Sequence, residues 1–437
     1  MNVLVVVLDS LRADKVGCYG PTVVQTPHLD ALAAQGVLLE RCYAEFPNTI
    51  PSRTALVAGT YTFTNRPWKE LEDRDLHIAE LFQAAGYRTA AFSDTPFNSG
   101  ARMDRGFQEF RHFPMGKCLP PIDDQPLLPH DDAYFPPGFP EKEVLYYPKT
   151  KTNRAYCLRK YGKYLPEMMI DEVETWLRAH RGEPFFLWVD SFNPHEPWDA
   201  PEPWRSMYKP RFGYEGRYLP MPMGPEMDWV MPGDLEHIHA LANACVTETD
   251  HYMGRLFAVL DELDLTEDTL LVVLSDHGVP IGEHGTIRKF NYPLYEELAH
   301  TLQLWRWPEH LPAGQRVAGL TSNVDFVPTV LSAAGIEPPH DLDGTDLLPL
   351  MRGETERARE HLFLGAFNYN AGVVTDDGWK FIDHRGSKAN ELYHLPTDPA
   401  EQSNLAEREP DRARALFQLL YDFHEPWRWK RSRHHRG

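Results

Sequence analysis

Cysteine is scarce in this sequence, and its spacing is irregular. The 437 residues contain five cysteines, an odd number, and none of them form the short paired spacing of a zinc knuckle. Neither a disulfide framework nor a structural zinc site is indicated, so a reducing cytoplasm is the expected location. The cysteines are Cys18, Cys42, Cys118, Cys157 and Cys245.

Long hydrophobic runs are also missing. The apolar run at residues 3–8 is too short for the core of a signal peptide, has no basic start and leads directly into Asp9. No run approaches the roughly 20 residues of a membrane-spanning helix. We therefore expect no membrane association.

Positive charge is in deficit. The chain has 44 Lys and Arg against 64 Asp and Glu, for a net charge of −20, which argues against binding of a nucleic acid backbone. An anionic substrate would have to be met by a local cluster of positive groups. Association of the chain with copies of itself is neither required nor excluded by its composition.

The first apolar run has the pattern of a central strand. Residues 2–8 are continuously apolar and rich in β-branched side chains, as in a strand of a parallel sheet that is buried on both faces. The same reasoning predicts strands at 88–92, 185–190 and 270–274, and helices at 26–34, 75–85, 169–177 and 235–263. In the first of these helices, Thr26 is the expected cap. This order predicts an α/β fold.

The hydrophobic pattern changes after about residue 352. Short alternating segments at 362–367, 372–375 and 379–382 predict a small antiparallel sheet, and a helix is expected at 410–421. We therefore divide the chain into a catalytic domain, residues 1–352, and a C-terminal subdomain, residues 353–437.

Two proline-rich insertions interrupt the predicted catalytic domain, near residues 108–163 and 199–232. Long insertions of this kind are either functional loops that shape a substrate pocket or plain surface decoration, and both readings stay open here. Their aromatic residues suggest contact with an apolar part of a substrate.

Polar residues follow two of the predicted central strands. Asp9 ends the first strand, and Asp276 and His277 follow the strand at 270–274. A single Asp at such a position is more often a helix cap. However, the carboxyl ends of parallel strands converge, and mixed carboxylate and imidazole donors suit one divalent cation, such as Mn, Zn, Ca or Mg.

The stretch PNTIPSRTAL, residues 47–56, predicts the start of a helix. Pro51 suits a first helical turn, which would place Thr49 just ahead of helix N–H groups that favour an alkoxide or a bound oxyanion. The alternative is that Thr49 only caps the helix.

These features together resemble the sulfatase family of the alkaline phosphatase superfamily. Family-like segments run along nearly the whole chain, namely VVLDSLRAD (6–14), the Thr49 stretch, NPHEPW (193–198), LSDHG (274–278), GEHG (282–285), Lys289 and ELYHLPTDP (391–399). The resemblance implies a central mixed β-sheet flanked by helices, with a small C-terminal antiparallel sheet.

The nucleophile position departs from the family pattern. In the family, the motif is Cys-x-Pro-Ser-Arg or Ser-x-Pro-Ser-Arg, and its first residue is oxidised to formylglycine. This sequence has Thr49 at that position. Threonine is not a substrate for that oxidation. No formylglycine is therefore expected, and Thr49 must act as an alcohol.

The resemblance also implies a role for each site residue. Asp9, Asp276 and His277 would be metal ligands with Thr49 as the fourth, and Arg53 would stabilise the nucleophile. His195 and Lys289 would contact the transferred group or protonate the leaving oxygen. Without the family, a turn histidine and a solvated surface lysine would be the simpler readings.

Three further departures bear on the substrate. Ser10 stands where many sulfatases have a second Asp, and His277 stands where many have Asn, and both changes resemble phosphonate monoester hydrolases and phosphodiesterases. The family's Gly-Lys-x-His segment is not recognisable after Phe92, where Thr95 is a weak substitute. Asp250 and His251 could form a second metal site, but a structural role in the long helix is the favoured reading.

We therefore predict a metal-dependent hydrolase that cleaves phosphodiesters or phosphonate monoesters through Thr49. One divalent ion with Arg53 and Lys289 suits a small monoanionic ester, whereas a phosphomonoester dianion is better served by two metals. Two alternatives remain: a sulfuric ester hydrolase that works without formylglycine, and a catalytically silent homologue that binds a metal and an anion.

Overall fold

The computed structural model describes residues 1–95, 100–113, 161–208, 227, 230–289 and 291–434, with side chains through residue 424. Most of the two proline-rich insertions, at 114–160, 209–226 and 228–229, lies outside these residues. The prediction that they shape a substrate pocket is therefore untested.

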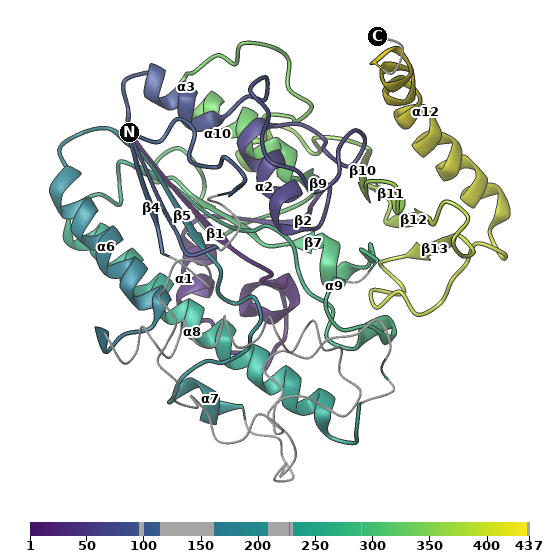
Figure 1. Cartoon of the computed structure of the whole chain (residues 1–437), viewed down its shortest axis with the longest axis horizontal. Coiled ribbons are helices and arrows are strands. Elements are labelled where there is room, and N and C mark those ends of the chain that lie inside the picture. Colours follow the sequence, from purple (N-terminus) through teal and green to yellow (C-terminus); the bar gives the residue numbers. More distant parts are fainter. Residues whose placement is uncertain (96–99, 114–160, 209–226, 228–229, 290, 435–437) are drawn as a thin grey trace.

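A nine-stranded mixed sheet forms the centre of the described chain (Figure 1). Its hydrogen-bonded order is β4-β3-β5-β1-β6-β8-β2-β7, and β9 pairs with β2 off this path. The strands are β1 (Asn2–Leu8), β2 (Val37–Tyr43), β3 (Arg88–Ser93), β4 (Glu109–His112), β5 (Phe185–Ser191), β6 (Thr269–Ser275), β7 (His300–Thr301), β8 (Gln303–Arg306) and β9 (Gln315–Ser322). The predicted α/β fold with a central mixed sheet is confirmed.

Strand β1 lies in the middle of the sheet, parallel to β5 on one side and to β6 on the other. Its side chains alternate between two hydrophobic cores: Val3, Val5 and Val7 in one, and Leu4, Val6 and Leu8 in the other. A strand covered on both faces must be apolar throughout, which explains its sequence.

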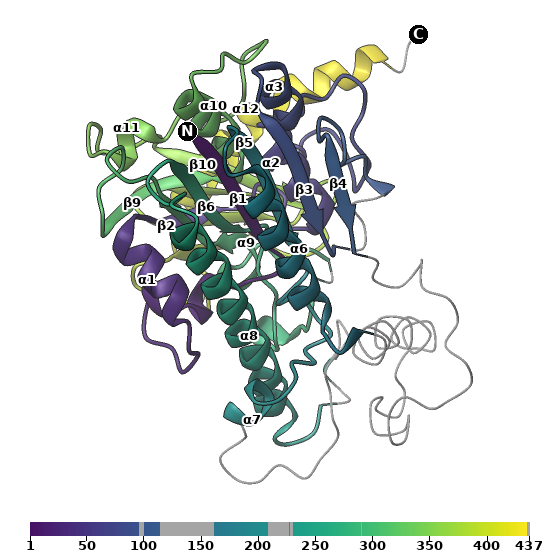
Figure 2. The same ribbon diagram turned by 90° about the vertical axis from the view of Figure 1, so that its left-hand side faces the viewer.

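Helices cover both faces of the sheet. Residues of α1, α6 and α8 share the core of Leu4 and Val6, and Figure 2 shows α6 and α8 crossing that face, while α2, α3 and α10 share the core of Val3 and Val5. The helices are α1 (Pro27–Gln35), α2 (Thr49–Ala58), α3 (Ile78–Ala84), α6 (Leu165–His180), α7 (Trp204–Met207), α8 (Asp234–Glu262), α9 (Glu296–Ala299), α10 (Phe326–Ala334), α11 (Leu348–Met351) and α12 (Pro410–His434), with 3-10 helices η1 (Ala13–Lys15), η2 (Gly17–Tyr19), η5 (Glu283–Gly285) and η6 (Asn323–Asp325). None of the described helices is both long enough and apolar enough to span a bilayer.

Thr26 is the N-cap residue of α1, as predicted, but its side chain makes no capping hydrogen bond. Its hydroxyl instead accepts a hydrogen bond from the backbone N–H of Gly17 at 2.9 Å. Helix α3 begins at Ile78 and not at Asp75, so this predicted start is wrong. The cap of α3 is His77, whose Nδ1 accepts from the N–H of Ala79 at 3.2 Å.

A separate four-stranded antiparallel sheet follows near the C-terminus, as predicted. Its strands are β10 (His361–Ala366), β11 (Asn370–Thr375), β12 (Trp379–Asp383) and β13 (Glu391–His394). Helix α12 packs on it through Leu416 and Leu420, and lies beyond this sheet at the right of Figure 1. The boundary between residues 352 and 353 stays a prediction.

Candidate active site

The site lies where β1 and β6 end side by side. Because these strands are parallel neighbours, Asp9 after β1 comes next to Asp276 and His277 after β6. One ligand atom from each of the three residues lies within 4.8 Å of the others, and all three side chains are fully buried.

Thr49 is the first residue of α2. The prediction placed it just ahead of the helix, so the helix begins earlier than expected. The cap is Asn48, whose Oδ1 accepts a hydrogen bond from the N–H of Thr49 at 2.9 Å, so the alternative that Thr49 is only a cap is wrong. The Thr49 hydroxyl lies 3.4 Å from Nε2 of His277 and is almost completely buried. Its position at a helix N-terminus favours negative charge on its oxygen.

The imidazole of His277 presents a lone pair to this group. Its Nδ1 is 2.7 Å from the carbonyl oxygen of Gly278 and donates to it, so Nε2 carries no proton in the neutral ring. Burial, reinforced by the charge of Lys289, lowers the pKa of His277 to about 3 and keeps the ring neutral. Nε2 therefore faces Oδ2 of Asp276 at 3.2 Å with no proton between them.

Ser10 orients both carboxylates. Its hydroxyl donates to Oδ1 of Asp9 at 2.8 Å, and its backbone N–H donates to Oδ1 of Asp276 at 3.0 Å. Its backbone has a φ of 62°, a conformation that non-glycine residues adopt rarely and often at functional sites. Where many sulfatases have a second Asp, this chain thus has a hydroxyl that holds the first one.

Arg53 lies among three buried carboxylates. It forms a two-pronged pair with Asp190, at 2.9 and 2.7 Å, and further pairs with Asp9, at 3.1 Å, and Asp276. Burial alone would lower the pKa of this guanidinium, but the three carboxylates raise it well above its usual value. Its hydrogen bond to Thr49 goes to the backbone carbonyl, at 3.3 Å, so its contact with the predicted nucleophile is indirect.

Asp190 is a site residue that the sequence reasoning missed. It is the residue before Ser191, the last residue of β5, and it pairs in register with Val7 of β1. Arg53 pairs with both Asp190 and Asp9. The hydroxyl of Thr95 donates to its Oδ1 at 2.8 Å, so this candidate substrate contact is engaged with Asp190. The sequence pattern that identified Asp9, an acid near the end of a buried apolar strand, is also present at Asp190.

The donor set fits one divalent cation. Among the described residues, Arg53 and Lys289 are the Lys and Arg side chains that act on Asp9 and Asp276, and Arg53 also pairs with Asp190, so three carboxylates stand against two positive charges. Burial and the neighbouring Asp276 raise the pKa of Asp9 to about 6. Oδ2 of Asp9 has no hydrogen-bond partner among the described residues, although Arg53 lies within ion-pair distance. A cation shared by these oxygens and Nε2 of His277 would remove the repulsion.

Lys289 joins His195 to this group. Its Nζ lies 3.1 Å from Nε2 of His195 and 3.3 Å from the hydroxyl of Ser10. Burial, with Lys289 and Arg288 nearby, lowers the pKa of His195 well below its usual value. The structure thus brings all seven predicted site residues together, and neither His195 nor Lys289 is a plain surface residue.

Asp250 has the structural role favoured from the sequence. Its two carboxylate oxygens accept from the N–H groups of His28 and Leu29, at 3.2 and 2.8 Å, in the first turn of α1. This use of both oxygens speaks against a second metal site.

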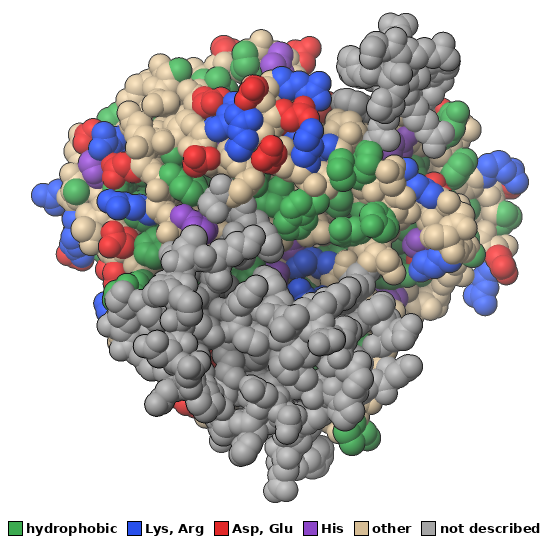
Figure 3. Space-filling view, in the orientation of Figure 1, with side chains coloured by type: hydrophobic (Ala, Val, Ile, Leu, Met, Phe, Trp, Pro, Cys, Tyr) green, Lys and Arg blue, Asp and Glu red, His purple; other side chains and the backbone are tan. Residues whose placement is uncertain are grey.

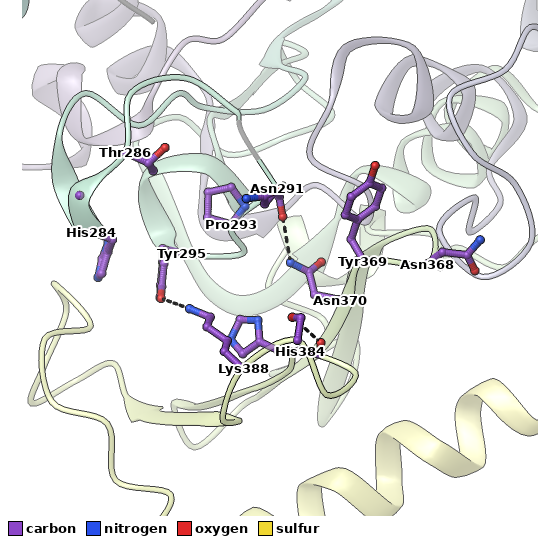
Figure 4. A pocket seen from close by; sticks show the side chains of 12 residues that line it. His284, Thr286, Asn291, Pro293, Tyr295, Asn368, Tyr369, Asn370, His384 and Lys388 are labelled. Carbon is purple, nitrogen blue, oxygen red and sulfur yellow. Dashed lines mark hydrogen bonds between the residues drawn. The ribbon is translucent and has the colours of Figure 1, made fainter. Parts of the chain in front are cut away.

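A cavity of about 520 Å³ lies between residues 284–295 and the C-terminal sheet (Figure 4). Its lining mixes polar and aromatic side chains, with Asn370, His384 and Lys388 on the sheet side. The ring of Tyr292 contacts both Tyr369, which lines the cavity, at 4.9 Å, and Phe46, at 5.7 Å. On the face in Figure 3, Lys, Arg and His side chains lie near the centre, beside a group of hydrophobic side chains.

Comparison with known proteins identifies the family. The Sulfatase family profile matches residues 1–336, which is most of the chain. The chain belongs to the sulfatase family. A second profile, described as the C-terminal part of N-sulphoglucosamine sulphohydrolase, matches residues 282–423 of this sulfatase-family protein. The prediction of a sulfatase-like ester hydrolase is thus confirmed at the level of the family.

Curated relatives of this sulfatase-family chain have different activities in their names. The multifunctional alkaline phosphatase superfamily protein PehA of Trinickia caryophylli is 26% identical over 476 residues, covering 93% of this chain and 91% of PehA. The ulvan-active sulfatase of Formosa agariphila is 28% identical, covering 92% and 76%. Among solved structures, the phosphonate monoester hydrolase of Agrobacterium radiobacter aligns with a TM-score of 0.73 over 98% of this chain and 96% of its own, at 23% identity, which shows a shared fold.

Proposed function

We propose that this sulfatase-family protein hydrolyses phosphodiesters or phosphonate monoesters through a covalent ester on Thr49. The observation that carries the proposal is the position of Thr49, an alcohol at the N-terminus of α2 with its hydroxyl 3.4 Å from Nε2 of His277. A threonine alcohol in this position can act as a nucleophile, but it cannot become formylglycine.

Asp9, Asp276, His277 and Thr49 would hold one divalent cation, which would supply Lewis-acid stabilisation of negative charge on the Thr49 oxygen. The proton of the Thr49 hydroxyl would pass to solvent. The N–H groups of the first turn of α2 then favour negative charge on the Thr49 oxygen. Ser10 keeps the Asp9 and Asp276 carboxylates turned toward the site through its two hydrogen bonds.

The reaction proceeds in two displacements at phosphorus. In the first, the Thr49 oxygen bonds to phosphorus and the leaving oxygen departs with the electron pair of its bond and a proton from the Lys289 and His195 pair. In the second, water bonds to phosphorus, the Thr49 oxygen departs, and a proton of the water returns to that pair. The Lys289 to His195 distance of 3.1 Å supports this shared role.

The charges of the site favour a monoanionic ester. Arg53 is paired with Asp190, Asp276 and Asp9, so within the described part of the site Lys289 is the cationic side chain available to face the substrate. One divalent cation and one lysine balance a monoanion better than the dianion of a phosphomonoester.

The test is hydrolysis of matched p-nitrophenyl esters by protein that has been stripped with a chelator and reconstituted with Mn, Zn, Ca or Mg. The expected order places the phosphodiester or the phosphonate above the sulfate and the phosphomonoester, with activity lost on metal removal. Thr49→Ala should abolish turnover and Thr49→Ser should retain part of it. Thr54→Ala is the matched control, because Thr54 lies on the same helix and its hydroxyl bonds to the carbonyl of Ile50.

A sulfuric ester hydrolase without formylglycine is the second candidate. It is favoured by the match to the C-terminal profile of N-sulphoglucosamine sulphohydrolase and by the relationship to the ulvan-active sulfatase. Turnover led by the sulfate ester in the same panel would establish it. Bound metal without turnover of any ester would instead support the silent homologue.

Three predictions from the sequence are kept as proposals beside this function. They are a cytoplasmic location, a catalytic domain at residues 1–352 with a subdomain at 353–437, and a small anionic ester as the substrate. Among the described residues, Cys18, Cys42 and Cys245 are free thiols. Self-association of the chain stays open.

A further inference from the structure

Glu196 is a fully buried carboxylate beside the predicted active site, and the mechanism above does not use it. It follows His195 directly in the loop after β5. Its Oε1 forms an ion pair with Nε of Arg288, and its Oε2 lies 3.4 Å from Nδ1 of His195. A buried carboxylate is retained only where its partners offset the loss of hydration.

The charge state of Glu196 follows from these partners. Burial alone would raise the pKa of Glu196, but Arg288 and the neighbouring His195 and Lys289 lower it below its usual range. The side chain is therefore an anion at neutral pH, and it is the acidic group that acts on the His195 ring.

His195 is held in one orientation. Its Nδ1 lies 2.5 Å from the backbone carbonyl of Glu196 and donates to it, and its ring stacks on Phe192 at a centroid distance of 4.0 Å. With the proton on Nδ1, Nε2 is left as the acceptor for Lys289.

Arg288 lies on the loop that carries Lys289. It directly precedes Lys289, its N–H donates to the carbonyl of Pro280 at 3.0 Å, and its backbone has a φ of 69°. The Glu196 to Arg288 ion pair therefore connects the loop that carries His195 with the loop that carries Lys289.

We propose that Glu196 is a positioning residue that, through Arg288, holds His195 and Lys289 together as one proton-donating unit facing the leaving oxygen. The inference rests on the proposed ester hydrolysis, but it applies to a phosphorus or a sulfur ester alike. In either case the bond from the central atom to the leaving oxygen breaks, that oxygen keeps the electron pair, and it takes the proton shared by Nζ and Nε2.

The test uses Glu196→Gln and esters with leaving groups of graded acidity, from p-nitrophenol through phenol to an alkyl alcohol, in whichever ester class the wild-type enzyme hydrolyses. Proton donation matters most for the poorest leaving group. We expect kcat/KM for the alkyl ester to fall at least about tenfold more than kcat/KM for the p-nitrophenyl ester, because kcat/KM reports the step that expels the leaving oxygen. Glu202→Gln is the matched control, because Glu202 is an exposed glutamate of the same segment paired with Arg205.

An equal loss of kcat/KM across all leaving groups, or no loss, would overturn the proposal. Glu196→Asp, which keeps the charge, should recover part of the alkyl ester activity if the variant with Gln is folded, and failure to do so would also count against it.

A second readout does not require turnover. In ¹⁵N spectra of histidine-labelled protein, with His195 assigned by its loss in His195→Gln, we expect a single ring form protonated on Nδ1. Glu196→Gln keeps the backbone carbonyl that accepts from Nδ1, so this ring form should persist, but the Nε2 signal should move because Lys289 is no longer held beside it. An unchanged His195 signal would refute the positioning role even if no ester is hydrolysed, so this outcome is distinct from failure of the proposed function.

Discussion

Arg53 is the residue on which the charge balance of the site depends. It is almost completely buried and is surrounded by Asp9, Asp190 and Asp276. Ion pairs in such surroundings contribute little net stability, yet removal of one partner leaves the other charges buried and uncompensated. The same carboxylates are those that would hold a divalent cation, so Arg53 and the cation share one negative cluster.

Removal of the Arg53 charge should destabilise the metal-free protein strongly. We expect Arg53→Met, which keeps much of the side-chain volume, to lower the free energy of unfolding by about 3–5 kcal/mol. The loss should be smaller with Mn²⁺ present, because the cation neutralises the same carboxylates. Denaturant unfolding with a chelator and with Mn²⁺ measures both values.

The control for Arg53 is an exposed ion pair. Arg316 pairs with Glu40 at 2.7 Å and its side chain is half exposed, so Arg316→Met should cost less than about 1 kcal/mol and show no metal dependence. Equal losses for the two variants would contradict the assigned role of Arg53.

At this scale, the sequence predicted the acids that directly follow strands and missed one that does not. Asp9, Asp276 and His277 stand out because an apolar run ends at them. Asp190 is followed by Ser191 within β5. It belongs to the site because β5 pairs with β1, and the order of residues does not specify which strands are neighbours. The ion pairs of Arg53 could not be predicted for the same reason.

Helix α2 is the element that places the nucleophile. Asn48 caps it through the N–H of Thr49, and Gly59 ends it in a left-handed conformation with a φ of 66°. All residues of α2 are buried, so its position is fixed by packing on every side. The cap adds a direct hydrogen bond to the backbone N–H of the first residue, Thr49.

Loss of the Asn48 cap should affect both stability and turnover. We expect Asn48→Ala to lower the free energy of unfolding by about 1 kcal/mol, since the first N–H of the helix loses its acceptor. It should also lower kcat, because the Thr49 backbone is no longer held at this position. Thermal unfolding and steady-state kinetics on one preparation measure the two effects.

His77→Ala is the matched control, since His77 caps α3 with a side-chain acceptor in the same way. It should lower stability by a similar amount and leave kcat unchanged. A kcat for Asn48→Ala equal to that of the wild type would show that the cap does not position Thr49.

Among elements, long periodic segments were predictable and short ones were not. Strands β7 and β8 have two and four residues, too few for a period, and they follow each other almost directly. Strand β7 pairs with β2, and β8 pairs with β6, because the surrounding sheet places them there. The antiparallel half of the sheet could therefore not be predicted strand by strand, whereas β1, β5 and β6 could.

On the scale of the whole molecule, Glu45 connects the two sheets. It lies between β2 and α2, its carbonyl accepts from the N–H of Gly365 in β10 at 2.7 Å, and its N–H donates to Asn323 at 3.0 Å. Its carboxylate accepts from Thr62 and from the N–H of Phe63, and no cation is paired with it among the described residues.

Glu45 should make stability depend on pH. Burial raises its pKa from 4.5 to about 8, so the folded chain keeps a proton that the unfolded chain releases above about pH 4.5. Its contribution is therefore full at low pH and is lost as pH rises toward 8. We expect Glu45→Gln to remove this decline, so that the difference in unfolding free energy between variant and wild type grows from pH 4.5 to 8.

Urea unfolding at a series of pH values measures that difference. Glu40→Gln serves as the control for the substitution itself, because Glu40 lies in β2 with a partly exposed carboxylate. A difference for Glu45→Gln that does not change with pH would mean that Glu45 does not hold its proton in the folded state.

The central claim is that Thr49 carries the transferred group as a covalent ester. It is tested most directly by acid quenching of the metal-reconstituted enzyme during turnover of a phosphonate monoester or phosphodiester, followed by peptide mass spectrometry. We predict a phosphonyl or phosphoryl adduct on the peptide that contains Thr49, absent from Thr49→Ala, which should also be inactive. Turnover that leaves this peptide unmodified and persists in Thr49→Ala would contradict the account.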